Sequence, residues 1–332
     1  MNQPIRIMKL RRRQILHLAA AAAALAVTEP TAKAQSYPTR PVRILVGFPP
    51  GGTTDIVARL IAHWLSERLG RQFIIENRSG ASTNLAVEAV IRAPADGYTL
   101  LTVGSSSLLN STFYPQLNLD LNRDLAMVAG LNNSPLVLEV HPAVPANSVA
   151  ELISYAKANP GRISMASYGA GSISHVAGEL FKMVAGVDIL HVPYRGSAAM
   201  LTDLLSGQVQ AAFDNLPASI EHIRTGRLRA LAVTTAARSE GLPHIPSLSE
   251  FLPGLEANAF LGIGAPKNTP AEIVLKLNQE INAGLSDPNM RARFAELGSA
   301  PLVLSPAEFG KLVQDETEKW AKVIRAAKIR AE

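Results

Sequence analysis

The segment that decides the fold is VRILVGFPPGGTTD, residues 42–55. Its first five residues are almost all apolar and predict a buried β-strand, which a glycine- and proline-rich loop follows directly. From Asp55 onward, apolar residues recur at intervals of three and four, as on one face of an α-helix, until Gly70 ends the pattern. Strand, loop and helix in this order indicate the first unit of an α/β fold.

The loop between this strand and helix favours an anion. Backbone N–H groups and the dipole at a helix N-terminus attract negative charge, and glycines allow a close approach. The loop nearly matches the phosphate-binding pattern GxxxxGK[ST], but Thr53 replaces the lysine, which argues against a nucleoside triphosphate. A smaller anion such as a carboxylate suits it better. The alternative is a tight turn in which Thr54 or Asp55 only caps the helix.

The same alternation of strand and helix continues along the chain. Further strands are predicted at 73–75, 98–103, 136–138, 163–167, 189–192, 210–213 and 228–233. Three helices are expected to begin at capping boxes whose hydroxyl residues are Ser148, Thr269 and Ser305. The pattern predicts an α/β fold with mainly parallel sheets flanked by helices.

Length and two extended crossings predict two domains. Segments 136–141 and 257–265 each have the pattern of a strand that passes from one domain to the other, which would make the first domain discontinuous. We expect domain 1 to comprise residues 35–138 and 257–332, and domain 2 to comprise residues 139–256. A cleft between two domains is a usual place for a ligand.

A second loop occupies the same position relative to its strand and helix. Residues 167–175, SYGAGSISH, follow a predicted strand and open a helix, but Ser174 replaces the third glycine of a dinucleotide-binding pattern. Two such loops, one in each domain, would direct two helix N-termini at one cleft. That geometry suits a molecule with a carboxylate at each end.

Other polar residues also follow predicted strands. Residues 105–107, three serines, either line the cleft or form a solvated turn. Arg195 either binds a carboxylate or lies on the surface without a ligand. Asp214 either binds a ligand group or caps a turn.

No catalytic or metal-binding set is evident in the sequence. His175 and Glu179 are spaced for one helix face, but no third metal ligand lies near them in the sequence. No nucleophile is paired with a base and an orienting group. The chain contains no cysteine, which excludes disulfides, thiolate metal sites and a cysteine nucleophile. We therefore expect no catalytic residue, no metal and no cofactor.

The net charge of +5 belongs to the first 34 residues. These hold six basic residues against one acidic residue, whereas the rest of the chain holds 26 of each sign. A basic start, an apolar stretch at 15–27 and Ala-Lys-Ala at 32–34 have the layout of a cleavable export signal of the Sec or twin-arginine type. We expect a periplasmic mature chain with no membrane span and, because it is neutral, no nucleic-acid partner.

Several motifs together resemble one protein family. They are Tyr37-Pro38-x-Arg40-Pro41, the loop 48–52 followed by Asp55, Pro94-x-Asp96-Gly97-Tyr98, Gly171-Ser172 with His175, Val192-Pro193-Tyr194-Arg195-Gly196, Phe213-Asp214, residues 226–233, and Pro266 with Lys276-Leu277-Asn278. With these, the chain is similar to the Bug or TctC-like substrate-binding receptors of tripartite tricarboxylate transporters. The likeness covers nearly all of the chain after residue 34.

The resemblance implies a two-domain periplasmic-binding-protein fold, type II-like, with the ligand cleft between the domains. It implies a small organic carboxylate as ligand and the membrane components of a tripartite tricarboxylate transporter as partners. The residues carried over to the ligand site are Phe48, Pro49, Pro50, Gly51, Gly52, Thr53, Thr54, Asp55, Ser105, Ser106, Ser107, Tyr168, Gly169, Gly171, Ser172, Ser174, His175, Arg195, Gly196, Asp214 and Asn215. The chain departs from the family pattern at 106–109 and 260–261, near the expected cleft, so the resemblance names no particular acid.

Two other functions stay open from the sequence. An exported hydrolase that acts on an anionic substrate would use His175 as its base. A ligand sensor for a periplasmic signalling partner would use the same fold and the same binding chemistry.

Overall fold

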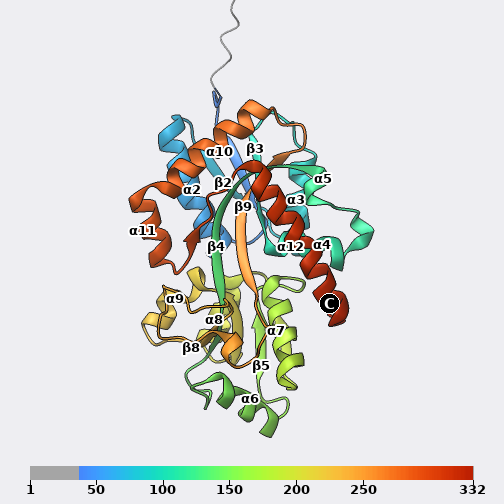
Figure 1. The fold of residues 1–332 in the computed structure, drawn as a ribbon, viewed down its shortest axis with the longest axis vertical. Coiled ribbons are helices and arrows are strands. Elements are labelled where there is room, and N and C mark those ends of the chain that lie inside the picture. The colour runs from blue at the N-terminus through green and yellow to red at the C-terminus, as the bar shows by residue number, and fades with distance from the viewer. Residues whose placement is uncertain (1–36, 332) are drawn as a thin grey trace, which may run out of the picture. The chain divides into compact units, whose positions relative to one another are not determined.

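The structure, a computed structural model, describes residues 37–331, and the expected export signal at 1–34 lies outside them. Residues 1–39 and 40–332 group as two units, and the account below concerns the second. Strands and helices alternate along most of this unit, as the sequence predicts (Figure 1).

The strands are β1 (Val42–Val46), β2 (Phe73–Asn77), β3 (Thr99–Gly104), β4 (Leu125–Val140), β5 (Ser164–Ser167), β6 (Leu190–Pro193), β7 (Ala211–Asn215), β8 (Arg229–Val233), β9 (Asn258–Pro266) and β10 (Ala300–Pro301). The helices are α2 (Thr53–Leu69), α3 (Asn84–Ile91), α4 (Ser105–Phe113), α5 (Leu121–Asp124), α6 (Val149–Ala158), α7 (Ile173–Ala185), α8 (Ser197–Leu205), α9 (Leu216–Arg224), α10 (Ala271–Ser286), α11 (Pro288–Glu296) and α12 (Pro306–Ala326). Short 3₁₀ turns lie at Ala81–Thr83, Pro115–Leu117 and Leu248–Glu250.

The strands form two groups that share β4. In the first group β1 pairs in parallel with β2 and β3, and β9 pairs antiparallel with β3 and β4. In the second group β5 pairs in parallel with β6 and β7, and β4 pairs antiparallel with β7 and β8. The expectation of mainly parallel sheets is corrected to a mixed sheet, because the chain leaves the first group along β4 and returns along β9.

Strand β4 changes partners partway along its length. Residues 125–135 pair with β9, which lies beside β4 in Figure 1. Residues 136–140 pair with β7, and residues 137–140 also pair with β8. This change lies close to the predicted domain boundary at 138, and β9 coincides with the second predicted crossing. Residues 40–332 nevertheless group as one unit, so the division into two domains stays a prediction.

Helix α2 follows the sequence pattern closely. Its residues Val57, Ile61 and Leu65 are buried, as the three-and-four spacing predicts. At its end Gly70 takes φ 65°, a left-handed conformation that glycine adopts without a side-chain clash, and its N–H donates to the Ser66 carbonyl.

The predicted capping boxes have different outcomes. Ser305 and Glu308 cap the start of α12 reciprocally. Ser148 accepts a hydrogen bond from the Glu151 N–H, but the Glu151 carboxylate accepts from the N–H of Asn147 instead of closing the box. The Thr269 box is wrong, because the Thr269 hydroxyl donates to the Pro266 carbonyl and α10 begins after Pro270.

Helix α12 packs closely on β9. Phe309 on this helix is fully buried and meets the Phe260 ring edge-on, with ring centroids 6.1 Å apart. At Gly262 the Phe309 ring fills the place that a side chain would take. This contact fixes the helix against the strand that borders the cavity described next.

Candidate ligand-binding site

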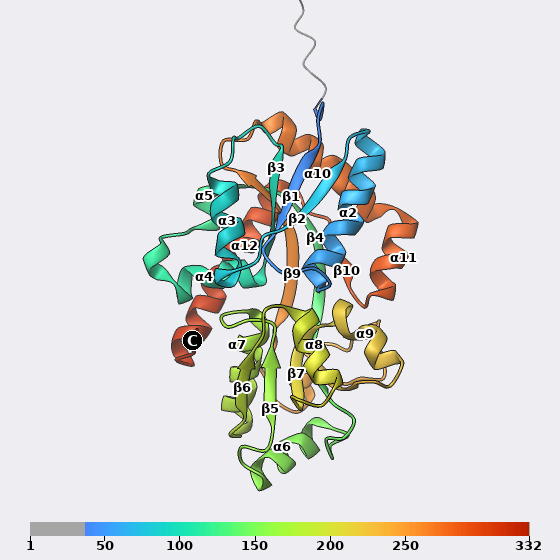
Figure 2. The ribbon, with the colours of Figure 1, turned by 180° about the vertical axis from the view of Figure 1, so that it is seen from behind.

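A small cavity lies where five helices begin. Each helix follows the carboxyl end of a strand: α2 after β1, α4 after β3, α7 after β5, α8 after β6, and α9 after β7. Their N-cap or first residues line the cavity, namely Gly52, Gly104, Ile173, Ser197 and Asn215. Figure 2 shows α2 and α4 above α7, α8 and α9. The sequence predicted two of these helix N-termini, and the structure brings three more to the same cavity.

Four of the five N-termini have no side-chain cap. No side chain accepts a hydrogen bond from the first turn of α2, α4, α8 or α9, whereas Ser172 caps α7 by accepting from the His175 N–H at 3.2 Å. First-turn N–H groups have no partner within their own helix, and the helix dipole adds positive potential there. The cavity therefore attracts an anion.

The lining of the cavity contains no charged side chain. It consists of Gly47, Phe48, Pro49, Gly52, Thr53, Thr54, Thr83, Thr102, Gly104, Ser105, Ser106, Ser107, Asn132, Ser134, Tyr168, Ile173, Ser197, Asn215, Ala259, Phe260 and Leu261. The cavity volume is about 40 Å³, which accommodates roughly three water-sized groups. Negative charge placed here would be stabilised by backbone dipoles and hydroxyl groups.

Three buried oxygen atoms in the lining have no hydrogen-bond partner in the protein. They are Thr53 Oγ1, Asn132 Oδ1 and Asn215 Oδ1. Buried polar atoms almost always have a partner, either within the protein or in a bound molecule. Their presence together in one cavity supports a polar occupant.

The loop between β1 and α2 is held by Asp55. The Asp55 carboxylate accepts hydrogen bonds from the Gly51 N–H (3.1 Å), from the Arg59 guanidinium (2.9 Å) and from the Asn77 amide (2.9 Å). Burial alone would raise the pKa of Asp55, but these donors lower it below its usual value. Gly51 takes φ 92°, which its turn toward Asp55 requires. Asp55 thus shapes the loop from behind and does not line the cavity.

The three serines at 105–107 form the first turn of α4. All three are buried, so the alternative of a solvated turn is wrong. Ser105 Oγ accepts from the Phe260 N–H at 2.9 Å, and Ser106 Oγ accepts from the Ile173 N–H at 3.4 Å. The second of these hydrogen bonds joins the two strand groups across the cavity.

The loop between β5 and α7 contacts the cavity through Tyr168 and Ile173. The Tyr168 ring meets Phe48 edge-on, with centroids 5.8 Å apart, and its hydroxyl accepts from the Asn215 amide at 3.3 Å. Burial, together with the nearby Asp214, raises the pKa of Tyr168 above its usual value, so the phenol stays neutral.

A strained segment, Ala81–Thr83, borders the cavity through Thr83. All three residues take left-handed conformations, with φ of 45°, 51° and 76°. Such conformations are costly for residues with a side chain and persist only where surrounding contacts hold them. The Asn110 amide donates to the Ser82 carbonyl, and the Ser82 hydroxyl donates to the Ala170 carbonyl at 2.9 Å in the loop after β5.

Ten of the residues carried over from the resemblance line the cavity: Phe48, Pro49, Gly52, Thr53, Thr54, Ser105, Ser106, Ser107, Tyr168 and Asn215. The others do not: Pro50, Gly51, Asp55, Gly169, Gly171, Ser172, Ser174, His175, Arg195, Gly196 and Asp214. Several of the latter support the loops, as Asp55 and Ser172 do. Arg195 is exposed, whereas Asp214 is fully buried behind Ser197.

The sequence analysis missed the residues that the crossing strands contribute. Asn132 and Ser134 come from β4, and Ala259, Phe260 and Leu261 come from β9. The predicted crossing at 257–265 contains the three residues of β9, and a strand that crosses between domains would pass beside the cleft, so this signal could have found them. Asn132 and Ser134 precede the other predicted crossing, 136–141, and no signal in the sequence pointed to them.

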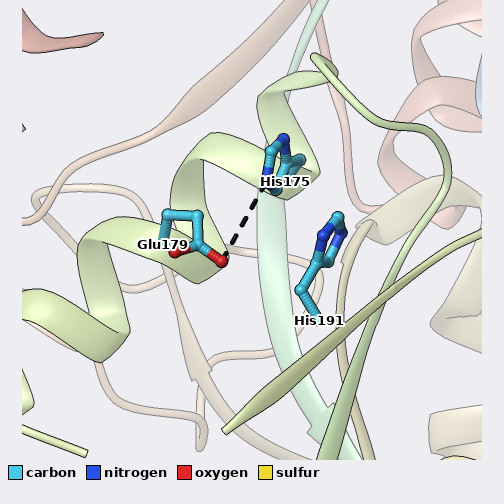
Figure 3. Close-up of side chains that lie close together, drawn as sticks. All are labelled: His175, Glu179 and His191. Atoms are coloured by element: carbon cyan, nitrogen blue, oxygen red, sulfur yellow. Dashed lines mark ion pairs between the residues drawn. The ribbon is translucent and has the colours of Figure 1, made fainter. Parts of the chain in front are cut away.

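His175, Glu179 and His191 lie close together beside this site (Figure 3). One ligand atom from each lies within 4.8 Å of the others, so the structure supplies the third residue that the sequence lacked. However, the two imidazole rings are stacked, with centroids 4.1 Å apart and planes 11° apart. Lone pairs of stacked rings point side by side and do not converge on one ion about 2.1 Å from each nitrogen.

Hydrogen bonds also engage both imidazoles. His175 Nδ1 accepts from the Gly171 N–H at 3.1 Å, and His191 Nε2 lies 2.8 Å from the Ser167 hydroxyl. The geometry favours a polar cluster that braces the loop before α7, and it does not favour a metal centre.

The buried His175 is expected to lower the free energy of unfolding in acid. Burial, together with His191 and Lys182, lowers the pKa of His175 to about 3. An unfolded histidine takes up a proton below about pH 6.5, whereas the folded one does not, so the free energy of unfolding falls as the pH drops below that value. We expect His175→Gln, compared with the wild type, to remove about 2 kcal/mol of this loss between pH 7 and pH 5. Urea unfolding of both proteins at each pH measures the effect. An equal loss of stability in the wild type and in His175→Gln would contradict the lowered pKa of His175.

A cavity lined by helix N-termini on this fold defines a solute-binding receptor of the periplasmic-binding-protein class. Residues 57–329 match the model of the tripartite tricarboxylate transporter family receptor, TctC. The chain belongs to this family, which is a class of receptors and not of enzymes, so the hydrolase alternative is set aside.

Relatives and solved structures agree with this assignment. The chain is 37% identical to Protein BugT of Bordetella pertussis over 295 residues, which covers 88% of this chain and 90% of the relative. An R. palustris protein solved with adipate, Rpa4515, has a TM-score of 0.86 and 41% identity, covering 89% of this chain and 99% of its own. MatC of Rhodopseudomonas palustris, solved with bound malate, has a TM-score of 0.82 and 32% identity, covering 87% of this chain and 100% of its own.

Proposed function

We propose that the protein captures a small organic dicarboxylate in the periplasm and delivers it to the membrane components of a tripartite tricarboxylate-type transporter. The observation that carries this proposal is the convergence of five helix N-termini on a cavity with no charged side chain. Such a site binds anions through backbone N–H groups and helix dipoles.

A ligand with two carboxylates fits the placement of these helices. Helices α2 and α4 begin after strands of the first group, and α7, α8 and α9 begin after strands of the second. One carboxylate can therefore meet each side. The related proteins solved with adipate and with malate also hold dicarboxylates.

Closure of the two strand groups around the ligand is the proposed mechanism. A cavity of about 40 Å³ accommodates a carboxylate group but not a whole six-carbon diacid. Entry then requires the two sides to separate, and binding shifts the equilibrium toward a form closed on the ligand. The hydrogen bonds from Ile173 to Ser106 and from Ser82 to Ala170 join the two strand groups, and they would break when the groups separate.

The periplasmic location rests on the leader and on the relatives. Residues 1–34 have the layout of an export signal, and the similar solved structures include periplasmic proteins. Within residues 37–331, every helix is too short or too polar to cross a lipid bilayer. We expect delivery to proceed by docking of the loaded receptor on the membrane components of the transporter.

A thermal-shift screen of small carboxylates tests the proposal. An acid present at a hundred times its Kd adds about 2.7 kcal/mol to the free energy of unfolding, which raises Tm by roughly 5 °C for a chain of this size. Adipate, malate and their neutral dimethyl esters form matched pairs, and only the free acids should stabilise the protein. Equal shifts with acid and ester, or no shift with any acid, would contradict anion binding at this site.

A further inference from the structure

Two carboxyl groups, Glu139 and Asp214, lie fully buried behind one wall of the cavity. Glu139 is on β4 and Asp214 is near the end of β7. The hydroxyl of Ser219, on α9, lies 2.8 Å from Glu139 Oε1 and 3.2 Å from Asp214 Oδ2. One hydroxyl group thus bridges the two acids.

This bridge requires a proton on one of the carboxyl groups. The Ser219 hydroxyl has a single hydrogen and can donate to only one of the two oxygens, so the other contact needs a carboxyl O–H as donor. Asp214 also accepts from the Ser197 hydroxyl (2.7 Å) and from the Asn215 N–H (2.8 Å), as suits a charged carboxylate. Glu139 Oε2 has no partner, which suits a neutral acid. The proton therefore belongs on Glu139.

Among residues 37–331, no cationic side chain influences the pKa of either acid. Ala212 on β7 and Ala230 on β8 lie opposite Glu139, and Tyr168, after β5, presents a neutral phenol to Asp214. The remaining hydrogen bonds come from Ser197 on α8, from Ser219 on α9 and from the Asn215 N–H.

The pKa directions agree with this arrangement. Burial, and next the charge of Asp214, raise the pKa of Glu139 well above its usual value. Burial raises the pKa of Asp214 to about 7, although hydrogen bonds from Ser197, Asn215 and Ser219 act in the opposite direction.

The acid pair is linked to the cavity through two lining residues. Ser197 and Asn215 both line the cavity, and both donate a hydrogen bond to Asp214 Oδ1. The Asp214 carboxylate is therefore separated from the cavity only by Ser197 and Asn215, the two residues that donate to it. An anion in the cavity is repelled by a charged Asp214, and a neutral Asp214 removes this repulsion.

We propose that Glu139 and Asp214 form a proton-binding site that holds one proton on Glu139 and takes up a second, on Asp214, when an anion enters the cavity. The inference rests on the proposed function, because the anion is the proposed ligand. The second proton comes from solvent and converts the Asp214 carboxylate to the acid. Anion affinity then falls as the pH rises, by at most about tenfold per pH unit for one linked proton.

Calorimetric titration with adipate, or with the acid that stabilises the protein most in the screen, tests the linkage. Titrations at pH 7.5 in buffers of different ionisation enthalpy should show uptake of a fraction of one proton per ligand, and Kd should rise between pH 7 and pH 9. In Asp214→Asn, which mimics the protonated acid, uptake should vanish and Kd should stay at the low-pH value of the wild type. Glu139→Gln should keep the wild-type pH dependence, as should the control Glu221→Gln, an exposed acid on α9.

Three results would overturn the proposal. They are binding to the wild type without proton uptake, an unchanged pH dependence in folded Asp214→Asn, and a loss of affinity at pH 6 in that variant, which would make Asp214 a direct acceptor for the ligand. Should Asp214→Asn fail to fold, the wild type and Glu139→Gln still decide the matter: proton uptake with the same pH dependence in both proteins supports the proposal, and binding without uptake in both contradicts it.

A ligand-free measurement separates this proposal from the proposed function. If no acid binds, the proposed function fails, and the proton site is then judged on melting temperature alone. A raised pKa in the folded state means that stability is lost as the pH rises. The wild type should therefore lose stability relative to Asp214→Asn between about pH 4, the ordinary pKa of an aspartate, and about pH 7, its raised value in the folded protein. Parallel curves over this range would overturn the proton site.

Discussion

Replacing Gly262 with alanine is expected to lower the free energy of unfolding by at least about 3 kcal/mol. The added Cβ would overlap the Phe309 ring and lie 2.5 Å from the Ala129 carbonyl oxygen. Neither neighbour can move easily, because Phe309 is fully buried and Ala129 lies in the ladder between β4 and β9. Urea unfolding of the wild type and Gly262→Ala measures the change.

Gly310, the residue after Phe309, supplies the matched control. It lies inside α12, and an added Cβ there would meet its nearest atom at 3.8 Å, an ordinary contact. Gly310→Ala should therefore stabilise the protein by about 0.5–1 kcal/mol, because alanine is the better helix former. Similar unfolding midpoints for Gly262→Ala and the wild type would show that α12 does not pack on β9 as described.

Replacing Asn132 with aspartate is expected to weaken binding of the acid found in the screen more than a hundredfold at pH 8. Asn132 is buried, lines the cavity and differs from aspartate only in an amide group. Two like charges about 5 Å apart repel by roughly 3 kcal/mol at an effective dielectric constant near 20. Burial should raise the pKa of the new carboxyl group, so part of the affinity should return at pH 5. Calorimetric titration at both pH values measures the effect.

Asn289→Asp is the control for this change of charge. Asn289 is exposed in the first turn of α11, where a negative charge is favourable, and it lies outside the cavity lining. This variant should bind the acid as the wild type does. Undiminished affinity in a correctly folded Asn132→Asp at pH 8 would show that the anion does not occupy this cavity.

Most of the strands and the two glycine-containing loops could be predicted from the sequence because their signals are local. The exceptions are β10 and the first part of β4, residues 125–135, which the sequence analysis did not predict as strand. β1 and α2 follow from an apolar run and from a three-and-four spacing that ends at Gly70. The short strands β5 to β8 likewise lie within two residues of their predicted bounds. Ten of the residues that the family resemblance implies line the cavity, and their contact with a ligand stays a prediction.

The remainder of the site depends on contacts between distant segments. Ser105 and Ser106 of α4 accept hydrogen bonds from the N–H groups of Phe260 and Ile173, which both lie more than 60 residues away. His191 joins His175 only because β6 pairs beside β5. The sequence left open whether Asp214 binds a ligand or caps a turn, and three hydrogen bonds hold it behind Ser197, outside the cavity lining. No pattern of spacing along the chain reports such arrangements.

The five helix N-termini have a consequence for how this receptor can change. A backbone N–H group is present whatever the side chain, so substitutions in the lining leave the anion-attracting groups in place. Phe260 and Leu261 on β9 and Ser106 on α4 could then vary to admit a longer, bulkier or more polar acid. Affinity for a carboxylate would thus depend on backbone atoms, and the choice among carboxylates would depend on side chains. Substitutions could therefore change which acid the receptor binds without first abolishing carboxylate binding.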